Sequence, residues 1–260
     1  MLEEVQRGTS RPRPPSALAG TRFLSAFRTD EEQQALEAAA LPVRTLRPNT
    51  DLLREGEATD QLHILIEGWG CRYKTTRDGS RQIVALVVPG DMANLDSLLF
   101  GRPDFGVRIL TAAKTVAIPC DAALALAERH AGIGRAFTRL ALGENAVLSQ
   151  WALCLGRKSA QQRLAHLFCE LGRRLTGENA SDDVSFDLPL TQEQLADTLG
   201  LTSVHVNRTL QQLRGEGLVE TANRTITLPD VPRLRDLAEF DPAYLHCGTV
   251  DTSALSPATT

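Results

Sequence analysis

The sequence predicts an α+β fold in three parts: an N-terminal antiparallel β-roll, a long dimerisation helix and a C-terminal winged helix-turn-helix. Three patterns predict it. Short strand-like runs alternate with turn residues, one apolar seam of helical spacing follows them, and two short capped helices precede a hairpin pattern. The predicted bounds are 22–130, 131–156 and 157–240, with poorly ordered ends at 1–21 and 241–260.

The composition is typical of a protein that works in the cytoplasm. No apolar run reaches the ~20 residues of a membrane span, and Met1–Gly20 is charged and proline-rich, unlike a secretory signal. The formal net charge of −4 requires any nucleic-acid contact to come from a local basic patch. The five cysteines are scattered without a CxxC pair, so we expect neither disulfides nor a metal site.

Four strand-like runs mark the predicted roll. Asp78-Gly79 between two of them is a strong hairpin signal, and Glu67-Gly68 ends another run. A short helix with Asp30 as its N-cap precedes the roll and ends near Ala40, and a second covers Ala122–Glu128. Strands of this length and spacing indicate an antiparallel roll or barrel. The expected strands are Leu62–Ile66, Ile83–Val88, Val107–Leu110 and Thr115–Ile118.

Apolar residues at steps of four and three predict one long helix from about Ile133 to Leu155. We expect this seam to pack on the same helix of a second copy. The alternative is a long helix that packs on its own domain. Glu144 occupies one slot of the seam, and Gly156 interrupts it as a natural hinge. The predicted dimer interface consists of Ile133, Phe137, Leu140, Val147, Trp151 and Cys154.

Local signals for a helix-turn-helix begin at Thr191. This residue can cap the amide of Gln194, whose side chain can reach back in a capping box. Leu195 and Leu199 form the buried stripe of this first helix, and Gly200 ends it where a left-handed residue is needed. The arrangement is the first half of a helix-turn-helix.

The second helix has one apolar and one polar face. Thr202 caps it, and no acidic residue occurs between Leu201 and Gly215, which is what a helix that reads a DNA groove requires. A hairpin pattern follows and completes a winged unit. The alternative is an ordinary helical hairpin in a core. The buried face consists of Val206, Leu210 and Leu213, and the outer face of Val204, Arg208 and Gln211, flanked by Ser203, Asn207 and His205.

Taken together, these segments resemble the Crp/Fnr superfamily of bacterial regulators over roughly residues 22–240. The roll segments that carry the resemblance are Arg54-Glu55-Gly56-Glu57, Leu62–Gly68 and Pro89-Gly90-Asp91. The long helix is similar to the family's dimer helix, Arg163-Leu164-Ala165 to the start of its DNA-binding domain, and Thr191–Leu218 to its helix-turn-helix.

The resemblance implies a role for each exposed residue of the helix-turn-helix. Ser203, Val204 and Arg208 occupy the base-reading positions. Because Ser203 and Val204 differ from the residues of many members, we expect a different half-site, with Val204 suited to a thymine methyl group. The residues expected to face phosphates are Thr202, His205, Thr191, Gln192 and Glu193.

The effector cassette, which binds the cyclic nucleotide in the nucleotide-binding members of this family, corresponds here to Gly90–Leu95 and Pro103-Asp104. Its residues differ from those of the nucleotide-binding members. Leu95 stands at the position of their ribose-binding Glu, and Asp104 at that of their phosphate-binding Arg, so we expect no cAMP or cGMP in the usual mode. Neither haem nor an iron–sulfur cluster is supported, because His63 is a lone candidate ligand and the oxygen-sensing branch needs cysteines near the N-terminus. Cys71 and Cys154 are either redox-sensitive thiols or packed core residues.

The sequence therefore predicts a sequence-specific DNA-binding transcription regulator, an activator or a repressor, that acts as a homodimer on a near-palindromic site. The expected partners are double-stranded DNA, a second copy and RNA polymerase. Its activity is controlled by a signal at the roll or by its abundance. No nucleophile–base constellation, P-loop or dinucleotide fingerprint is present, so no enzyme is predicted. The alternative function is a roll-containing regulatory module that docks on a partner protein.

Overall fold

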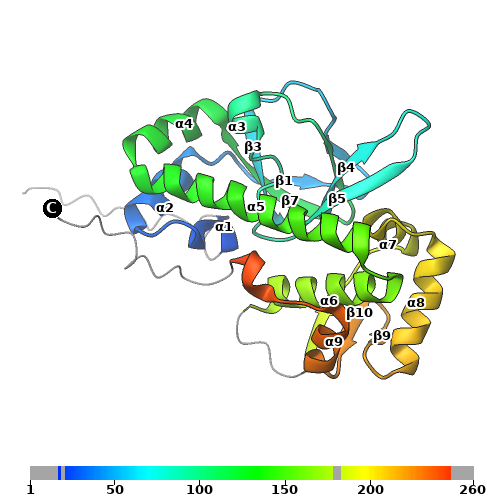
Figure 1. Cartoon of the computed structure of the whole chain (residues 1–260). Helices are drawn as coiled ribbons and strands as arrows, with labels where there is room; N and C mark the ends of the chain where they lie inside the picture. The colour runs from blue at the N-terminus through cyan, green and yellow to red at the C-terminus, as the bar shows by residue number, and fades with distance from the viewer. Residues whose placement is uncertain (1–16, 19–20, 178–182, 247–260) are drawn as a thin grey trace, which may run out of the picture.

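The computed structural model describes residues 17–18, 21–177 and 183–246. A β-roll occupies one end, a long helix lies across it, and a smaller domain of helices and a short sheet lies on the other side of that helix (Figure 1). Most of the two predicted disordered ends lies outside the described residues, as does Cys247. Among the described residues, no helix is both long and apolar enough to span a bilayer.

Two antiparallel sheets form the roll. One has the strand order β1-β7-β3 and the other β2-β6-β4-β5. The four expected strands are present, but β1, β2 and β4 were not expected. The hairpin turn between β4 and β5 contains Gly79 at φ +88°, as predicted. The strands are β1 (Arg44–Leu46), β2 (Asp51–Leu53), β3 (Gln61–Glu67), β4 (Gly70–Thr75), β5 (Arg81–Val87), β6 (Gly106–Ile109) and β7 (Ala113–Pro119).

Short helices close the ends of the roll. The cap of α2 is Thr29, not Asp30 as predicted, because its hydroxyl accepts from the Glu32 amide and Glu32 reciprocates in a capping box. Leu18, inside the predicted disordered end, is completely buried in the roll core. The helices are α1 (Arg22–Ser25), α2 (Asp30–Ala39), α3 (Ser97–Phe100) and α4 (Cys120–Arg129).

The predicted dimer seam faces the inside of its own subunit. The long helix α5 (Ala131–Arg157) buries Ile133 and Phe137 in the roll core, and Trp151 and Cys154 in a second core. The partly buried Leu140 and Val147 pack against the same two cores. Four of the six residues predicted for the dimer interface, Ile133, Phe137, Trp151 and Cys154, are therefore covered within their own subunit. An inward stripe on a long helix has the same spacing as a coiled-coil seam.

The predicted hinge is also displaced. Gly156 lies inside α5, and the helical conformation ends at Lys158, where the backbone becomes extended. Ser159 then caps α6 (Ala160–Thr176) in a capping box with Gln162. The chain direction therefore changes at Lys158 and Ser159.

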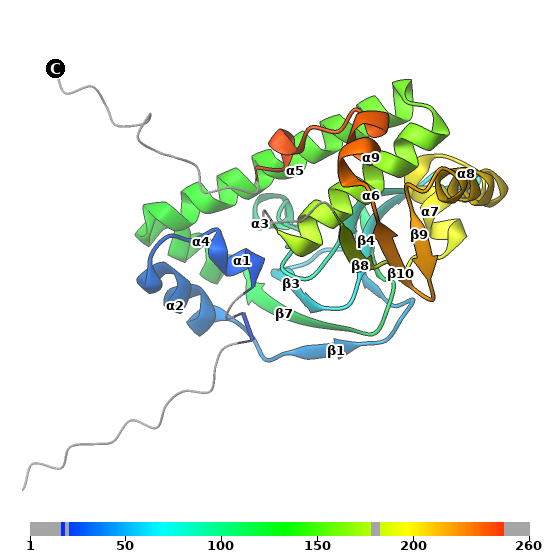
Figure 2. The ribbon, with the colours of Figure 1, turned by 90° about the horizontal axis from the view of Figure 1, so that it is seen from below.

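The C-terminal domain packs α6 against a three-stranded sheet of order β8-β10-β9. The predicted hairpin is confirmed as β9 and β10, whereas α9 was not expected. The segment Pro242–Leu245, assigned to the disordered tail, forms the 3₁₀ helix η1 and packs on α5. Figure 2 shows α5 along one edge of the molecule with α6 and α9 beside it. The elements are β8 (Val184–Asp187), α7 (Gln192–Leu199), α8 (Ser203–Gly215), β9 (Glu220–Ala222), β10 (Thr225–Leu228) and α9 (Val231–Ala238).

Candidate nucleic-acid interface

The start of α7 is built by its capping box. The Thr191 hydroxyl accepts from the Gln194 amide at 3.1 Å, and the Gln194 side chain accepts from the Thr191 amide at 2.8 Å, as predicted. Thr191, Gln192 and Glu193 are all exposed. The positive end of the α7 dipole and its first side chains therefore face solvent, where a phosphate can approach.

The turn between the two helices fixes the orientation of α8 relative to α7. Gly200 adopts the left-handed conformation at φ 62°, and the Thr202 hydroxyl caps α8 by accepting from the His205 amide at 3.2 Å. Leu195 and Leu199 of α7 are buried with Val206 and Leu213 of α8 in one core. The helix-turn-helix is thus present as predicted, and its apolar faces are fully used inside the domain.

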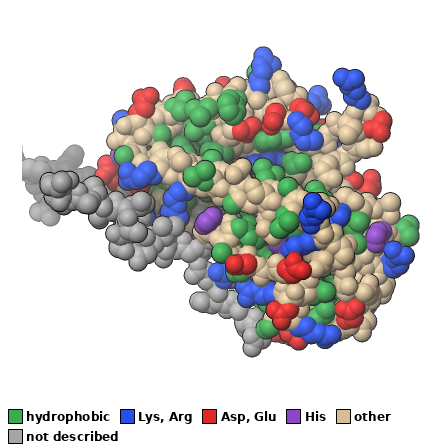
Figure 3. All heavy atoms as spheres, viewed as in Figure 1, with side chains coloured by type: hydrophobic (Ala, Val, Ile, Leu, Met, Phe, Trp, Pro, Cys, Tyr) green, Lys and Arg blue, Asp and Glu red, His purple; other side chains and the backbone are tan. Residues whose placement is uncertain are grey.

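The outer face of α8 is uncovered. Val204 is 81% exposed, and Asn207, Arg208 and Gln211 are exposed as well, while Ser203 and His205 are half-buried beside them. The Asn207 amide donates to Gln192 Oε1 at 3.3 Å, which joins this face to the start of α7. Histidine, basic and apolar side chains lie together at the edge of the molecule over α8 (Figure 3). The structure therefore brings the predicted base-facing and phosphate-facing residues onto one surface.

A cleft beside the wing was not predicted. It has a volume of about 390 Å³ and lies between the last turns of α8 and strand β9. Arg214 supplies its positive charge and Glu220 its negative charge. Its walls are Gln211, Arg214, Gly215, Val219, Glu220 and Thr221. Little in the sequence indicates this cleft, because it forms only where the β9–β10 hairpin folds back beside α8.

The effector cassette places its two predicted residues in different environments. Leu95 is 6% exposed and packs in the roll core, so its side chain does not face a ligand site. Asp104 is exposed, and its backbone carbonyl accepts from Lys74 Nζ. Of the two positions that bind a cyclic nucleotide in the resembling members, one is therefore buried and the other exposed in this chain.

Comparisons with known proteins agree with both parts of the fold. The Crp-like helix-turn-helix domain family matches residues 162–237, and the cyclic nucleotide-binding domain family matches residues 43–130. The nitrogen fixation regulation protein FixK of Bradyrhizobium diazoefficiens is 31% identical over 71% of this chain and 76% of that protein. The chain belongs to the Crp/Fnr superfamily of transcription regulators.

Two further relatives cover still more of this Crp/Fnr regulator. The transcriptional activator protein FnrL of Cereibacter sphaeroides is 27% identical over 82% of this chain and 87% of that protein. The structure of FixK2 from Bradyrhizobium japonicum superposes with a TM-score of 0.69 at 26% identity, over 75% of this chain and 96% of that one. These proteins are regulators, so the chain is not an enzyme.

The candidate sensing residues of this Crp/Fnr regulator are buried. Burial lowers the pKa of His63 to about 4, so its imidazole is neutral, and it is 5% exposed. Burial raises the pKa of the Cys71 thiol to about 12 and also raises that of Cys154. Among the described residues, no group of three or more His, Cys, Asp or Glu side chains is arranged to hold a metal ion.

Sequence reasoning missed two arginine–carboxylate networks that join the roll to the helices. Arg72 on β4 is bound by Glu144 of α5, and Arg174 of α6 is bound by Asp91 and Glu170. Burial alone would lower the pKa of the Arg72 guanidinium, but the carboxylates of Glu144, Asp96 and Asp91 together hold that pKa above its usual value. Glu144 in the inward seam was the available signal, because a carboxylate within an apolar stripe requires a partner.

Proposed function

We propose that this regulator binds a near-palindromic DNA site as a homodimer and activates transcription there. The observation that carries the proposal is the uncovered face of α8, with Arg208 exposed at its centre and the start of α7 beside it. In a two-fold dimer, two such helices enter successive major grooves about 34 Å apart. Similarity to FnrL, a transcriptional activator protein, supports activation as the direction of control.

Base reading is assigned to three residues of α8. Arg208 has the length and the paired donors to bind guanine O6 and N7, and the Val204 side chain suits a thymine methyl group. Ser203 is the third base-facing residue. The phosphate contacts are assigned to the N-terminal ends of α7 and α8, where backbone amides and side chains point outward.

The dimer contact is assigned to the exposed side of α5, outside the buried seam. Leu142, Leu148 and Leu153 on the solvent-exposed part of α5 are 63%, 44% and 48% exposed. Apolar side chains lie along α5 on the face toward the viewer in Figure 3. Exposed positions at steps of three and four, the spacing of a two-helix seam, are Thr138, Ala141, Asn145, Leu148 and Ala152. A second copy is the occupant that such a self-complementary seam fits.

No cofactor is assigned. Leu95 of the cassette is buried in the core. His63 and Cys71 are also buried, at positions that are not grouped with other candidate ligands in the part of the chain that the structure describes. RNA polymerase is the proposed protein partner, since an activator at a promoter acts on that enzyme. A DNA target also fits a cytoplasmic location.

Fluorescence anisotropy with an inverted-repeat duplex tests the DNA contact. Arg208→Ala should weaken binding by about 1–3 kcal/mol and relax sequence preference at one position of each half-site. Arg139→Ala is the matched control, because Arg139 is exposed on α5 away from α8. Affinity that does not change with salt or with Arg208→Ala would refute DNA binding by this face.

Sedimentation velocity tests the dimer contact. Leu148→Glu places a charge in the proposed seam and should convert the dimer to a monomer. Leu99→Glu is the control, since Leu99 is 77% exposed on α3. If Leu148→Glu stays dimeric, the α5 seam is not the interface.

A further inference from the structure

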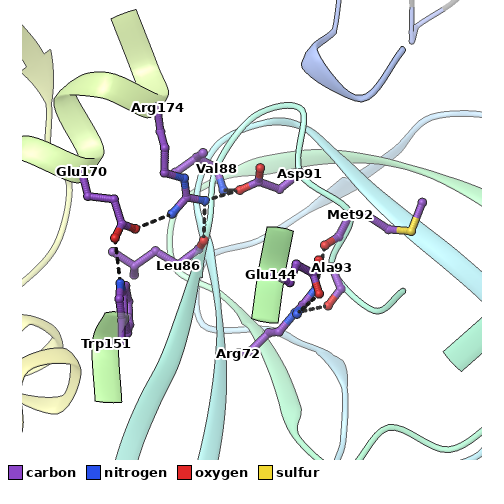
Figure 4. A network of polar contacts seen from close by, with 10 residues as sticks. All are labelled: Arg72, Leu86, Val88, Asp91, Met92, Ala93, Glu144, Trp151, Glu170 and Arg174. Atoms are coloured by element: carbon purple, nitrogen blue, oxygen red, sulfur yellow. Dashed lines mark hydrogen bonds and ion pairs between the residues drawn. The ribbon is translucent and has the colours of Figure 1, made fainter. Parts of the chain in front are cut away.

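Two arginines with little exposed side chain, Arg72 and Arg174, hold the same three residues of the roll from different sides. These residues, Asp91–Ala93, are called the cassette loop. Arg72 Nε donates to the Ala93 carbonyl at 2.7 Å, and Nη2 donates to the Met92 carbonyl at 2.9 Å. Arg174 Nη2 donates to Asp91 Oδ2 at 2.6 Å (Figure 4). One short loop is therefore bound by a side chain from β4 and by one from the DNA-binding domain.

Arg72 also binds the long helix. Its Nη1 and Nη2 donate to the two carboxylate oxygens of Glu144 at 2.7 and 2.8 Å, a bidentate pair. The guanidinium lies 5.0 Å from the centre of the Phe105 ring, which covers it. The Arg72 side chain is 9% exposed and that of Glu144 is 35% exposed. A single side chain thus joins the cassette loop to α5.

Arg174 joins the same loop to the DNA-binding domain. It lies on α6 and donates to the Leu86 carbonyl of β5 at 3.0 Å and to Glu170 at 3.2 Å. Glu170 is completely buried and accepts from Trp151 Nε1 of α5 at 2.9 Å. Roll, long helix and α6 are therefore connected by one polar network (Figure 4).

A second contact fixes the helix-turn-helix itself on the roll. Arg81 of β5 pairs with Asp197 of α7 at 2.6 Å, and the Gln82 side chain donates to the Thr198 carbonyl at 3.2 Å. Neither contact uses the outer face of α8. The docked arrangement therefore leaves the proposed DNA-reading residues free to meet a groove.

We propose that the cassette loop is a ligand-free latch, in which Arg72 and Arg174 fix α5 and the DNA-binding domain on the roll in the DNA-binding arrangement. The proposal rests on the proposed function. In the nucleotide-binding members that the chain resembles, the cassette binds an effector. Here Leu95 lies in the core, and the chain's own Arg72–Glu144 pair joins the loop to α5. Two consequences follow: DNA binding needs no small molecule, and residues remote from DNA control the affinity.

The affinity of full-length protein for the inverted-repeat duplex, measured without added ligand, tests both consequences. Glu144→Gln keeps the shape of the side chain and removes the charge opposite Arg72, and Asp91→Asn does the same opposite Arg174. Each should raise Kd about tenfold, within the range usual for coupled sites. Asp51→Asn is the matched control, because it breaks the Arg108 pair of the same roll without touching α5 or α6. Saturating cAMP or cGMP should leave the wild-type Kd unchanged.

Hydrogen exchange of the free protein provides a readout that does not depend on DNA. Amides of the cassette loop and of α6 should exchange faster in Glu144→Gln and Asp91→Asn than in Asp51→Asn. Asp91 also accepts a hydrogen bond from the Val88 amide at 2.8 Å, so its replacement disturbs the loop itself. If Asp91→Asn does not fold, Glu144→Gln alone tests the latch. Unchanged exchange and unchanged Kd in folded Glu144→Gln would overturn the latch, as would tighter DNA binding with cAMP or cGMP. If the wild type binds no duplex, the proposed function is refuted. The exchange rates still test whether Arg72 and Arg174 fix α5 and the DNA-binding domain on the roll.

Discussion

Replacing Tyr244 by phenylalanine removes one hydroxyl from a buried polar cluster between α6 and η1. This hydroxyl donates to Glu170 Oε2 at 2.8 Å and lies 3.1 Å from His166 Nε2. Glu170 is completely buried, and its other partners are Trp151 and Arg174. The variant keeps the ring and its stacking on His166, so the lost hydrogen bonds are the only change.

The expected loss follows from the charge and burial of the acceptor. A hydrogen bond to a charged group contributes about 1.5–3 kcal/mol to stability. For a chain of this size, each kcal/mol shifts the midpoint of thermal unfolding by about 2–4 °C. Tyr244→Phe should therefore lower the melting temperature by about 3–12 °C.

The chain contains two tyrosines, and the other provides a matched control. The hydroxyl of Tyr73 is 3.4 Å from Asp51 Oδ1 in a half-exposed position, so Tyr73→Phe should change stability by less than about 1 kcal/mol. Differential scanning calorimetry and urea unfolding of both variants measure the difference. Equal melting temperatures for the two variants would refute the reasoning that η1 anchors the buried Glu170.

Three further predictions concern stability and reactivity. Burial lowers the pKa of His63 and of His166 from 6.5 to about 4 in the folded protein, so the unfolded chain binds more protons between these pH values. The free energy of unfolding should therefore fall as the pH is lowered from 6.5 to 4, by up to about 3 kcal/mol per histidine. Urea titrations in which stability stayed constant across this range would contradict the prediction. Gly68→Ala should destabilise far more than Gly79→Ala in the same assay, because both have φ +88° but a Cβ at Gly68 would lie 2.3 Å from the Ala112 carbonyl oxygen. The Cys71 thiol should resist alkylation in the native protein at pH 8, and rapid labelling detected by mass spectrometry would show that its burial is misjudged.

The helix-turn-helix could be predicted because its signals are local. A capping box at Thr191, a left-handed Gly200 and a cap at Thr202 each act within a few residues. The strands of the roll with strong β-branched runs were predicted for the same reason. The short strand β2 was missed, since Asp51–Leu53 is defined mainly by its pairing with β6.

The dimer face of α5 could not be assigned from spacing. Both sides of the helix have residues at steps of three and four, and which side faces the roll depends on packing between distant segments. The partner of Glu144 lies 72 positions away on β4, where no local pattern points to it. The same holds for Arg174 and Asp91, which are joined only when α6 packs on the roll.

One apolar core crosses the boundary between roll and DNA-binding domain. Trp69, Ile83 and Leu86 of the roll are buried in the same cluster as Phe168 and Leu199 of the C-terminal domain. Cutting the chain at the end of α5 would expose this shared surface to water on both fragments. The two domains should therefore unfold in one cooperative transition, and neither fragment alone should retain the stability that it has in the whole chain.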